Sequence, residues 1–269
     1  MIPRMLEHYR RTEGWLGREI DYRARVDSTN DQLMAVGEAG ADEGAVMVAD
    51  VQTAGRGRLD RTWHAPVGTC LLMSMLFRPP GPFATYAPRT TMACSLAVLD
   101  AIEATTGLTL ALKWPNDVIA EDEEEPRGWA KVAGLLSEIG MRLEQPDFLV
   151  VGVGLNVNLP KAYLADLAPG ATSLLALAGY PVSRVQLLDR LLAAAERRYD
   201  AMRAGEEDPF EAWRSALAWL GEEVDVHTPT GVVRGVAEDV DAYGRLRVRL
   251  PDGLRHTFTA GDVSLRRTY

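Results

Sequence analysis

The clearest chemical signal in the sequence lies in residues 55–61, GRGRLDR, which combine three arginines and one aspartate with two glycines. The chain carries a formal net charge of −9, so this local excess of positive charge indicates an anionic ligand. The glycines allow the backbone to approach that ligand closely. On charge alone, solvated arginines on an ordinary surface loop remain an alternative. A Walker A loop is excluded, because no Gly-Lys-Ser or Gly-Lys-Thr follows.

A second candidate is Lys131, which begins the otherwise apolar run KVAGLLSEIG, with Gly134 three positions later. Strand side chains alternate between faces, so a leading lysine can point into a site beside a close backbone approach. A strand-end lysine that reaches solvent is the competing interpretation. Taken singly, Trp63, Trp114 and Asn116 are equally well explained as packing residues at loop ends.

The segment VGVGLNVN, residues 151–158, resembles a dinucleotide-binding fingerprint only superficially, since no third glycine opens a helix. Glycines within a strand favour tight packing or a ligand that passes over the backbone. No serine, cysteine or histidine occurs in a recognised nucleophile motif, and the four histidines are scattered. An enzyme with this sequence would therefore work mainly through positioned charges.

Strands and helices must position these residues. The hydrophobic patterns predict strands at 18–26, 45–51, 69–77, 130–142 and 148–158, with two short strands flanking LKWPND. They predict helices at 87–106, 183–204 and 208–219, and a further helix that begins at residues 28–30. Thr29 and Gln32 have the spacing of a capping box at that helix start. Residues 52–66 lack a hydrophobic period and are expected to form a loop.

From Glu222 onward the pattern changes to short alternating strands separated by turns, which is typical of a small β-barrel. The fold class expected is therefore α+β, with a mixed sheet flanked by helices and a C-terminal barrel. The predicted domains are residues 1–219 and residues 220–269.

Composition narrows the class of protein further. The chain has 269 residues, of which 47% are hydrophobic, and its two cysteines, Cys70 and Cys94, lie in apolar stretches. The N-terminal sequence lacks the apolar core of a secretion signal, and no run of about 18 apolar residues occurs. These features predict a soluble, cytoplasmic protein, and the acidic balance argues against a nucleic-acid partner. The five acids at 121–125 are expected to form a solvated hairpin tip.

Taken in order, DSTN, QTAGRGRLDRTWHAP, KWPNDV, KVAGLLSE, VGVGLNVN and the C-terminal GDVSLR resemble the biotin protein ligase family. The resemblance covers almost the whole chain from about residue 18. It implies a catalytic domain of the class II synthetase type, followed by an SH3-like barrel. The implied activity is ATP-dependent conversion of biotin to biotinyl-5'-AMP, with Mg²⁺, and transfer of biotin to a lysine of a biotin carboxyl carrier protein.

The resemblance also implies roles for individual residues. Lys131 and Arg58 are the implied catalytic cations, and the segment around Arg58 is expected to close over biotin. The implied biotin-binding residues are Ser28, Thr29, Asn30, Gln52, Arg56, Gly57, Arg58, Lys131 and Gly134. The implied ATP-binding residues are Arg61, Trp63, Asn116 and Asn156. No metal ligands are indicated.

The sequence departs from the family at His64 and Ala65, where an aromatic residue and a serine are common, and at Asp60, which is often glycine. One alternative is a lipoate or octanoate ligase or transferase of the same fold. Another is a non-enzymatic biotin sensor that represses transcription. Such sensors carry a DNA-binding domain of about 60 residues before the DSTN motif, whereas 27 residues precede Ser28 here. The expected state is a monomer or weak homodimer.

Overall fold

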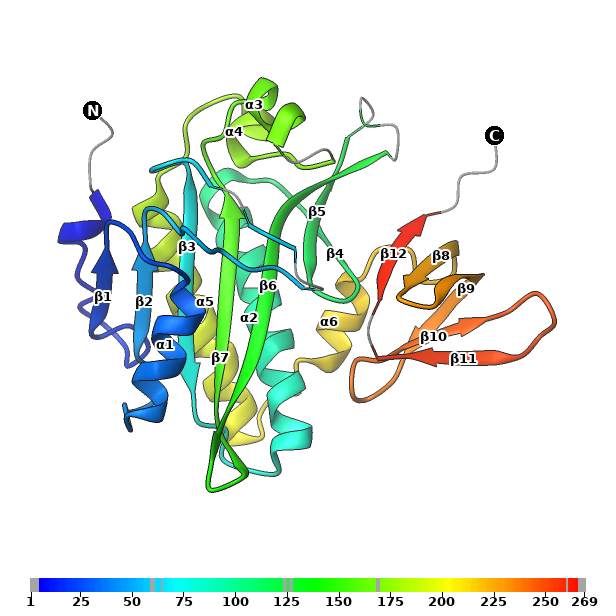
Figure 1. The fold of residues 1–269 in the computed structure, drawn as a ribbon, viewed down its shortest axis with the longest axis horizontal. Coiled ribbons are helices and arrows are strands. Elements are labelled where there is room, and N and C mark those ends of the chain that lie inside the picture. The colour runs from blue at the N-terminus through cyan, green and yellow to red at the C-terminus, as the bar shows by residue number, and fades with distance from the viewer. Residues whose placement is uncertain are drawn as a thin grey trace.

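The computed structural model describes residues 5–58, 61–63, 65–122, 125, 128–167, 170–259 and 261–265. Its main element is a seven-stranded mixed sheet with the strand order β1-β2-β3-β7-β6-β5-β4 (Figure 1). β1 and β2 are parallel, and the other neighbours are antiparallel. The strands are β1 (Ile20–Arg23), β2 (Val46–Ala49), β3 (Cys70–Phe77), β4 (Ala111–Lys113), β5 (Asp117–Glu121), β6 (Trp129–Arg142) and β7 (Gln145–Asn156). The predicted α+β class with a mixed sheet is confirmed.

Helices cover both faces of this sheet (Figure 1). The short helix α1 (Thr29–Glu38) packs on one face, where Leu33, Leu76 and Phe148 form a small core. The long helices α2 (Phe83–Thr106) and α5 (Arg184–Ala204) pack together on the other face. The remaining helices are η1 (Met5–His8), α3 (Lys161–Leu167), α4 (Leu174–Ala178) and α6 (Phe210–Ala216). The sequence patterns did not predict η1, α3 or α4, and none of the described helices is long and apolar enough to cross a membrane.

The start of α1 lies where the sequence predicts it, but the predicted capping pair is wrong. Ser28 is the capping residue, and its side chain accepts a hydrogen bond from the Asp31 backbone N–H at 3.4 Å. A capping residue requires an extended backbone, which Ser28 has, whereas Thr29 is already helical. The side chain of Gln32 instead donates to Asp27. Ser28 and Thr29 are thereby held at the helix N-terminus, facing the sheet.

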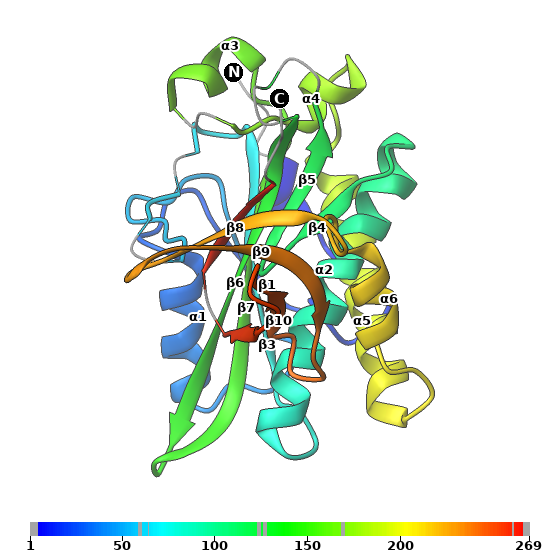
Figure 2. The ribbon, with the colours of Figure 1, turned by 90° about the vertical axis from the view of Figure 1, so that its right-hand side faces the viewer.

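A second, five-stranded antiparallel sheet follows α6, with the order β11-β10-β9-β8-β12 (Figure 2). Its strands are β8 (Glu223–Thr228), β9 (Gly231–Val240), β10 (Leu246–Arg249), β11 (Arg255–Phe258) and β12 (Asp262–Leu265). The predicted C-terminal β-module is confirmed. Within the described residues, no pairing joins β11 to β12, so closure of the expected barrel is not observed.

The two sheets contact each other directly. The indole N–H of Trp114, beside β4, donates to the Gly244 carbonyl at 2.8 Å. Arg89 of α2 donates to the Ala242 carbonyl at 2.6 Å, and Arg214 of α6 pairs with Asp239 at 2.6 Å. These contacts hold the second sheet against α2, α6 and the residue that follows β4.

Gly37 provides a test of how α1 packs on the sheet. A Cβ at this position would lie 2.4 Å from the ring of the fully buried Phe148. Alanine normally stabilises a helix relative to glycine by about 0.5–1 kcal/mol. We expect Gly37→Ala to lower the free energy of unfolding by about 1–3 kcal/mol instead, because the ring cannot move without disturbing the core. Urea unfolding would measure this, with exposed Glu38→Ala as the control. A variant more stable than wild type would contradict the packing.

Candidate active site

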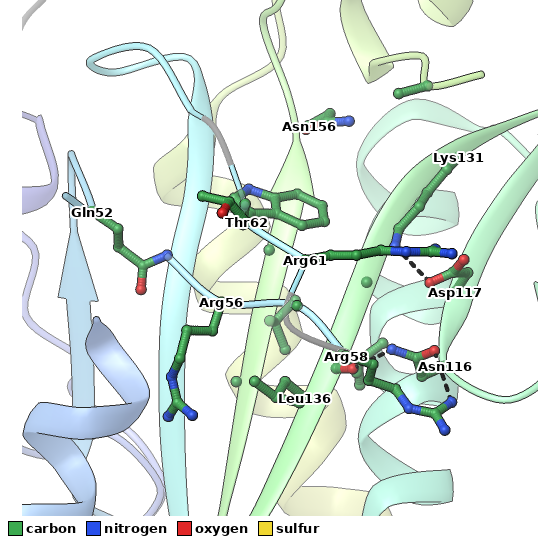
Figure 3. A pocket seen from close by; sticks show the side chains of 18 of the residues that line it. Gln52, Arg56, Arg58, Arg61, Thr62, Asn116, Asp117, Lys131, Leu136 and Asn156 are labelled. Carbon is green, nitrogen blue, oxygen red and sulfur yellow. Dashed lines mark hydrogen bonds and ion pairs between the residues drawn. The ribbon is translucent and has the colours of Figure 1, made fainter. Parts of the chain in front are cut away.

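The sequence-predicted site residues come together around one pocket of about 320 Å³. Its walls come from the start of α1, residues 52–58 and 61–63, β6, β7 and the turn between β4 and β5 (Figure 3). The start of β12 contributes Asp262. All thirteen predicted residues line it: Ser28, Thr29, Asn30, Gln52, Arg56, Gly57, Arg58, Arg61, Trp63, Asn116, Lys131, Gly134 and Asn156. The structure thus unites segments that are up to 128 residues apart in sequence.

The pocket is strongly positive in an acidic chain. Its described lining includes five cationic side chains and two carboxylates, Asp117 and Asp262. The cations are Arg56, Arg58, Arg61, Lys113 and Lys131. Such a surplus suits an anionic ligand, as the sequence of the 55–61 segment predicts.

One end of the pocket is a network of uncharged hydrogen-bonding groups. Gln52 Oε1 accepts from the backbone N–H of Thr29 at 2.7 Å and from its hydroxyl at 3.0 Å. The hydroxyl of buried Ser74 lies 2.8 Å from Thr29 Oγ1 and 2.6 Å from Asn30 Oδ1. The Gln52 amide nitrogen points into the cavity (Figure 3). This end therefore offers neutral donors and acceptors to a polar, uncharged group.

Asn30 is held by the protein at both ends of its amide. Its Nδ2 donates to the Leu136 carbonyl at 3.1 Å and to Glu138 Oε2 at 2.7 Å. Its Oδ1 accepts from Ser74 at 2.6 Å. Both amide hydrogens are therefore used, and Asn30 has no donor left for a ligand.

The other end of the pocket is built around Lys131. A β-bulge in β6 places Lys131 opposite Ile119 and Ala133 opposite Val118, so Val132 is the extra residue. The bulge brings Lys131 and Gly134, three positions apart, onto the same side. The Lys131 ammonium lies 2.6 Å from Asp117 (Figure 3). It also lies 5.4 Å from the centre of the Trp63 ring.

Three glycines make room for these side chains. A Cβ at Gly134 would lie 2.9 Å from the Lys131 ammonium. A Cβ at Gly152 would lie 2.1 Å from Asn30 Oδ1, and one at Gly154 would lie 2.7 Å from the Trp63 ring. The glycines of VGVGLNVN are therefore explained by tight packing against pocket side chains, one of the two interpretations given above.

Arg58 is the pocket arginine with the weakest partner among the described residues. Its Nη1 lies 3.4 Å from Asn116 Oδ1, and no described carboxylate lies within ion-pair distance of it. Burial lowers the pKa of Arg58, and the negative charges of Asp117 and Asp262 only partly oppose this effect. The guanidinium remains charged at neutral pH. It is therefore a partly buried cation in need of an anion.

Asn116 and Asn156 are also anchored by the protein. Asn116 Nδ2 donates to the Leu135 carbonyl at 2.6 Å, and Asn156 Nδ2 donates to the Thr172 carbonyl at 3.0 Å. The Trp63 indole nitrogen is buried without a hydrogen-bond partner in the described part of the chain. The Trp63 ring faces the pocket, so it can offer a flat apolar surface to a ligand.

Three charged pocket residues, Lys113, Asp117 and Asp262, were not predicted from the sequence. The Lys113 side chain is 4% exposed, and its ammonium lies 2.7 Å from Asp262 and 4.4 Å above the Trp129 ring. Arg61 pairs with the same Asp262 at 2.9 Å. Burial alone would raise the pKa of Asp262, but Lys113 and Arg61 outweigh burial and hold it at about 2. Lys113 and Asp117 lie in LKWPND, and Asp262 lies in GDVSLR. The motifs that indicate the family therefore contained a signal for all three residues.

Two further predictions concern the segments around the site. Asp60 and His64, two of the three departures from the family pattern, lie outside the described residues, whereas Ala65 is described. In the acidic run at 121–125, Glu121 ends β5, and residues 123 and 124 are also outside the described part. The Asp122 side chain is only 12% exposed and lies 3.5 Å from Lys161. The expectation of a fully solvated tip is therefore wrong for Asp122, because an ion pair with α3 covers it.

Comparison with known proteins gives two family matches. Residues 22–156 match the biotin/lipoate A/B protein ligase family, and residues 219–266 match the biotin protein ligase C terminal domain. The biotin–[acetyl-CoA-carboxylase] ligase of Mycobacterium tuberculosis is 36% identical over 255 residues, which cover 93% of this chain and 89% of the relative. The bifunctional ligase/repressor BirA of Bacillus subtilis is 31% identical over 252 residues, covering 93% of this chain and 75% of the relative.

Solved structures show the same similarity. The biotin protein ligase from Aquifex aeolicus in complex with biotin and ATP superposes with a TM-score of 0.71 at 28% sequence identity. The match covers 93% of this chain and 99% of that chain. The similarity therefore includes both sheets.

The low pKa of Asp262 leads to a pH-dependent prediction. A carboxyl group whose pKa falls on folding adds stability above its ordinary pKa of 3.8, and this stability is lost as the pH falls towards 2. We expect Asp262→Asn to lower the melting temperature at pH 7, because buried Lys113 loses its closest carboxylate. The gap between variant and wild type should shrink between pH 4 and pH 2. Thermal melts across this range would test it, and a gap independent of pH would contradict the assignment.

Proposed function

Because the chain belongs to the biotin/lipoate A/B protein ligase family, we infer that it uses ATP to convert biotin to biotinyl-5'-AMP and transfers the biotinyl group to a protein lysine. The acceptor that we propose is a biotin carboxyl carrier protein, in line with the name of the M. tuberculosis relative. The observation that carries the proposal is the two-ended pocket. Neutral hydrogen-bonding groups lie at one end and a surplus of cations at the other.

Two observations favour biotin over lipoate or octanoate. The C-terminal residues match a domain that is named for biotin protein ligases. The neutral end of the pocket also presents the Gln52 amide and the Ser28 and Thr29 hydroxyls, which suit the donors and acceptors of a urea ring. An alkyl chain or a dithiolane offers no acceptor to the Gln52 amide nitrogen, and burying this nitrogen against such a group would leave it unpaired.

In the first step, a biotin carboxylate oxygen attacks the α-phosphorus of ATP and pyrophosphate leaves. The main obstacle is the repulsion between two anions. Lys131 and Arg58 lie on the cationic side of the pocket, where they can screen both groups and hold them in line. Each preorganised cation can contribute on the order of 2–4 kcal/mol to this step. The Lys131 ammonium is already fixed by Asp117, so little reorganisation is needed.

In the second step, the carrier lysine attacks the carbonyl carbon of the mixed anhydride, and AMP leaves with the bonding electrons. The adenylate must be kept from water between the two steps. Gly57 and Arg58 line the pocket, and we propose that they cover the reactive bond. The Trp63 ring and the Asn116 and Asn156 amides line the side that we assign to the nucleotide.

Mg²⁺ is expected to accompany ATP. Protein sites for Mg²⁺ usually combine one or two carboxylates with substrate phosphates. The described residues contain no group of three His, Cys, Asp or Glu that could hold a metal by itself. Asp117 is a pocket carboxylate that can supply one such ligand. The ion would thus be held mainly by the nucleotide, whose charge it would screen.

Lys131→Ala tests the proposed function and the role of its central cation. Wild type should release pyrophosphate from ATP only when biotin is present, and should not respond to lipoate. Loss of one preorganised cation should lower the turnover of this step by roughly 10²- to 10³-fold. Lys161→Ala is the matched control, since Lys161 is half-exposed on α3 and does not line the pocket. Near-normal turnover of a folded Lys131→Ala protein would contradict the assignment, and biotin-independent release by wild type would contradict the function.

Arg58→Gly tests retention of the intermediate. The change removes a cation and adds backbone freedom, so ordering of this segment over the adenylate becomes less favourable. The variant should still consume ATP with biotin, more slowly because one cation is lost, but free biotinyl-5'-AMP should escape and label bystander lysines. A biotin blot of an added non-substrate protein, run beside pyrophosphate release, would measure this. A variant that forms adenylate yet labels only its carrier would show that Arg58 does not retain it.

A further inference from the structure

Glu138 is a charged residue on β6 that the reaction steps above do not use. It follows the apolar part of the strand, and its side chain is only 25% exposed. Its carboxylate accepts hydrogen bonds from Arg56 Nη2 at 2.8 and 2.9 Å and from Asn30 Nδ2 at 2.7 Å. One carboxylate therefore joins the arginine-glycine segment to the start of α1.

Arg56 is neutralised by the protein itself. Asp31, in the first turn of α1, pairs with the same guanidinium nitrogen as Glu138. Partial burial would lower the pKa of Arg56, but the two carboxylates outweigh it and raise the pKa above its ordinary value. The side chain points away from Lys131 and Asn116 (Figure 3). With two carboxylates around one cation, this cluster does not attract an anion, so the Arg56 side chain is better suited to hold the segment than to bind a substrate charge.

Fixing Arg56 fixes the backbone around it. Arg56 forms an isolated β-bridge with Thr62, and the Trp63 N–H donates to the Gly55 carbonyl at 2.8 Å. Gly57 N–H donates to the Arg61 carbonyl at 2.6 Å. The ion cluster on Arg56 is thus the point where this segment is attached to α1 and β6.

Glu138 is also connected by hydrogen bonds to the neutral end of the pocket. It holds Asn30, which contacts Ser74, and Ser74 in turn contacts Thr29. Thr29 fixes the Gln52 side chain, whose amide nitrogen faces the cavity. The chain of contacts from Arg56 to Gln52 therefore passes through Glu138.

We propose that Glu138 is a positioning residue that holds the Gly55–Arg58 backbone and the Asn30–Gln52 network in one arrangement around the substrate. The expected effect of Glu138 on biotin binding rests on the proposed function. The attachment of Arg56 to α1 and β6 does not depend on that function. Glu138→Gln removes the charge but keeps an oxygen that can accept from Asn30. Asp31→Asn weakens the Arg56 cluster and leaves the Glu138–Asn30 bond intact.

The attachment of Arg56 to α1 and β6 can be tested without any substrate. The measurement is the rate of trypsin cleavage after Arg56 in the full-length protein. Loss of one ion pair of this exposure should raise that rate on the order of threefold to tenfold in Glu138→Gln, and less in Asp31→Asn. Raising the salt concentration should bring wild type towards the variant, because partly exposed charges are screened. A purely structural defect would not respond to salt in this way.

The effect on the reaction is measured as steady-state kinetics of biotin-dependent pyrophosphate release. In Glu138→Gln the KM for biotin should rise about fivefold to tenfold, while kcat changes less than twofold. Glu238→Gln is the matched control, because Glu238 also accepts from two arginines and is 28% exposed, but neither of these arginines lines the pocket. It should change neither measurement.

The outcomes are distinguishable. Wild-type cleavage after Arg56 in both Glu138→Gln and Asp31→Asn would overturn the proposal, as would faster cleavage with an unchanged KM for biotin. If Glu138→Gln did not fold, Asp31→Asn alone would decide whether the cluster attaches Arg56. Faster, salt-dependent cleavage together with no biotin-dependent activity in wild type would support the attachment and refute the proposed function instead.

Discussion

The mutual repulsion of the five cations that the structure describes around one pocket is the constraint on which the rest of the site depends. At 4 Å, two like charges near a protein surface repel by about 4 kcal/mol at an effective dielectric constant of 20. Carboxylates beside most of the cations reduce this repulsion. Asp117 lies beside Lys131, and Asp262 beside Lys113 and Arg61. These pocket carboxylates are therefore counterions, which leave a net positive field directed at the ligand.

The fixed positions of these charges come from the backbone of the large sheet. Regular alternation would place Lys131 and Gly134 on opposite faces, but the bulge at Val132 brings them to the same face. The missing side chain at Gly134 then leaves room for the ammonium, and Gly154 leaves room for Trp63. A preorganised charge is effective because it needs no rearrangement when the substrate arrives. In this site the preorganisation depends on one inserted residue and on the absence of two side chains.

Sequence patterns could predict those features that are local. The strands, the main helices and the C-terminal β-module follow from hydrophobic period and turn residues, and the arginine-glycine segment stands out by charge. The capping pair at α1 was wrong by one residue, because spacing alone does not reveal whether Ser28 or Thr29 has the extended backbone. Membership of the pocket could be predicted for all thirteen residues only through resemblance to a family, since no single motif spans the site.

What the sequence could not show is the pairing of distant charges. Lys113 and Asp262 are 149 residues apart, and Asn30 and Glu138 are 108 apart. Neither contact can be inferred from hydrophobic periodicity, because each depends on how two distant elements pack together. The role of Arg56 likewise could not be predicted from the sequence, because its partners lie on distant elements. In the sequence it is one of three equivalent arginines, whereas in the structure two carboxylates from α1 and β6 take up its charge.

The C-terminal sheet is part of the site for an electrostatic reason. Lys113 is almost fully buried, and burying an ammonium without a partner is strongly unfavourable. Asp117 lies 3.8 Å away and is shared with Lys131, so the close partner of Lys113 is Asp262, the first residue of β12. Removing the second sheet would leave Lys113 without this partner and Arg61 without its ion pair. The charge balance of the pocket is therefore complete only when the two sheets are in contact. Every site residue predicted from the sequence, in contrast, lies before residue 157.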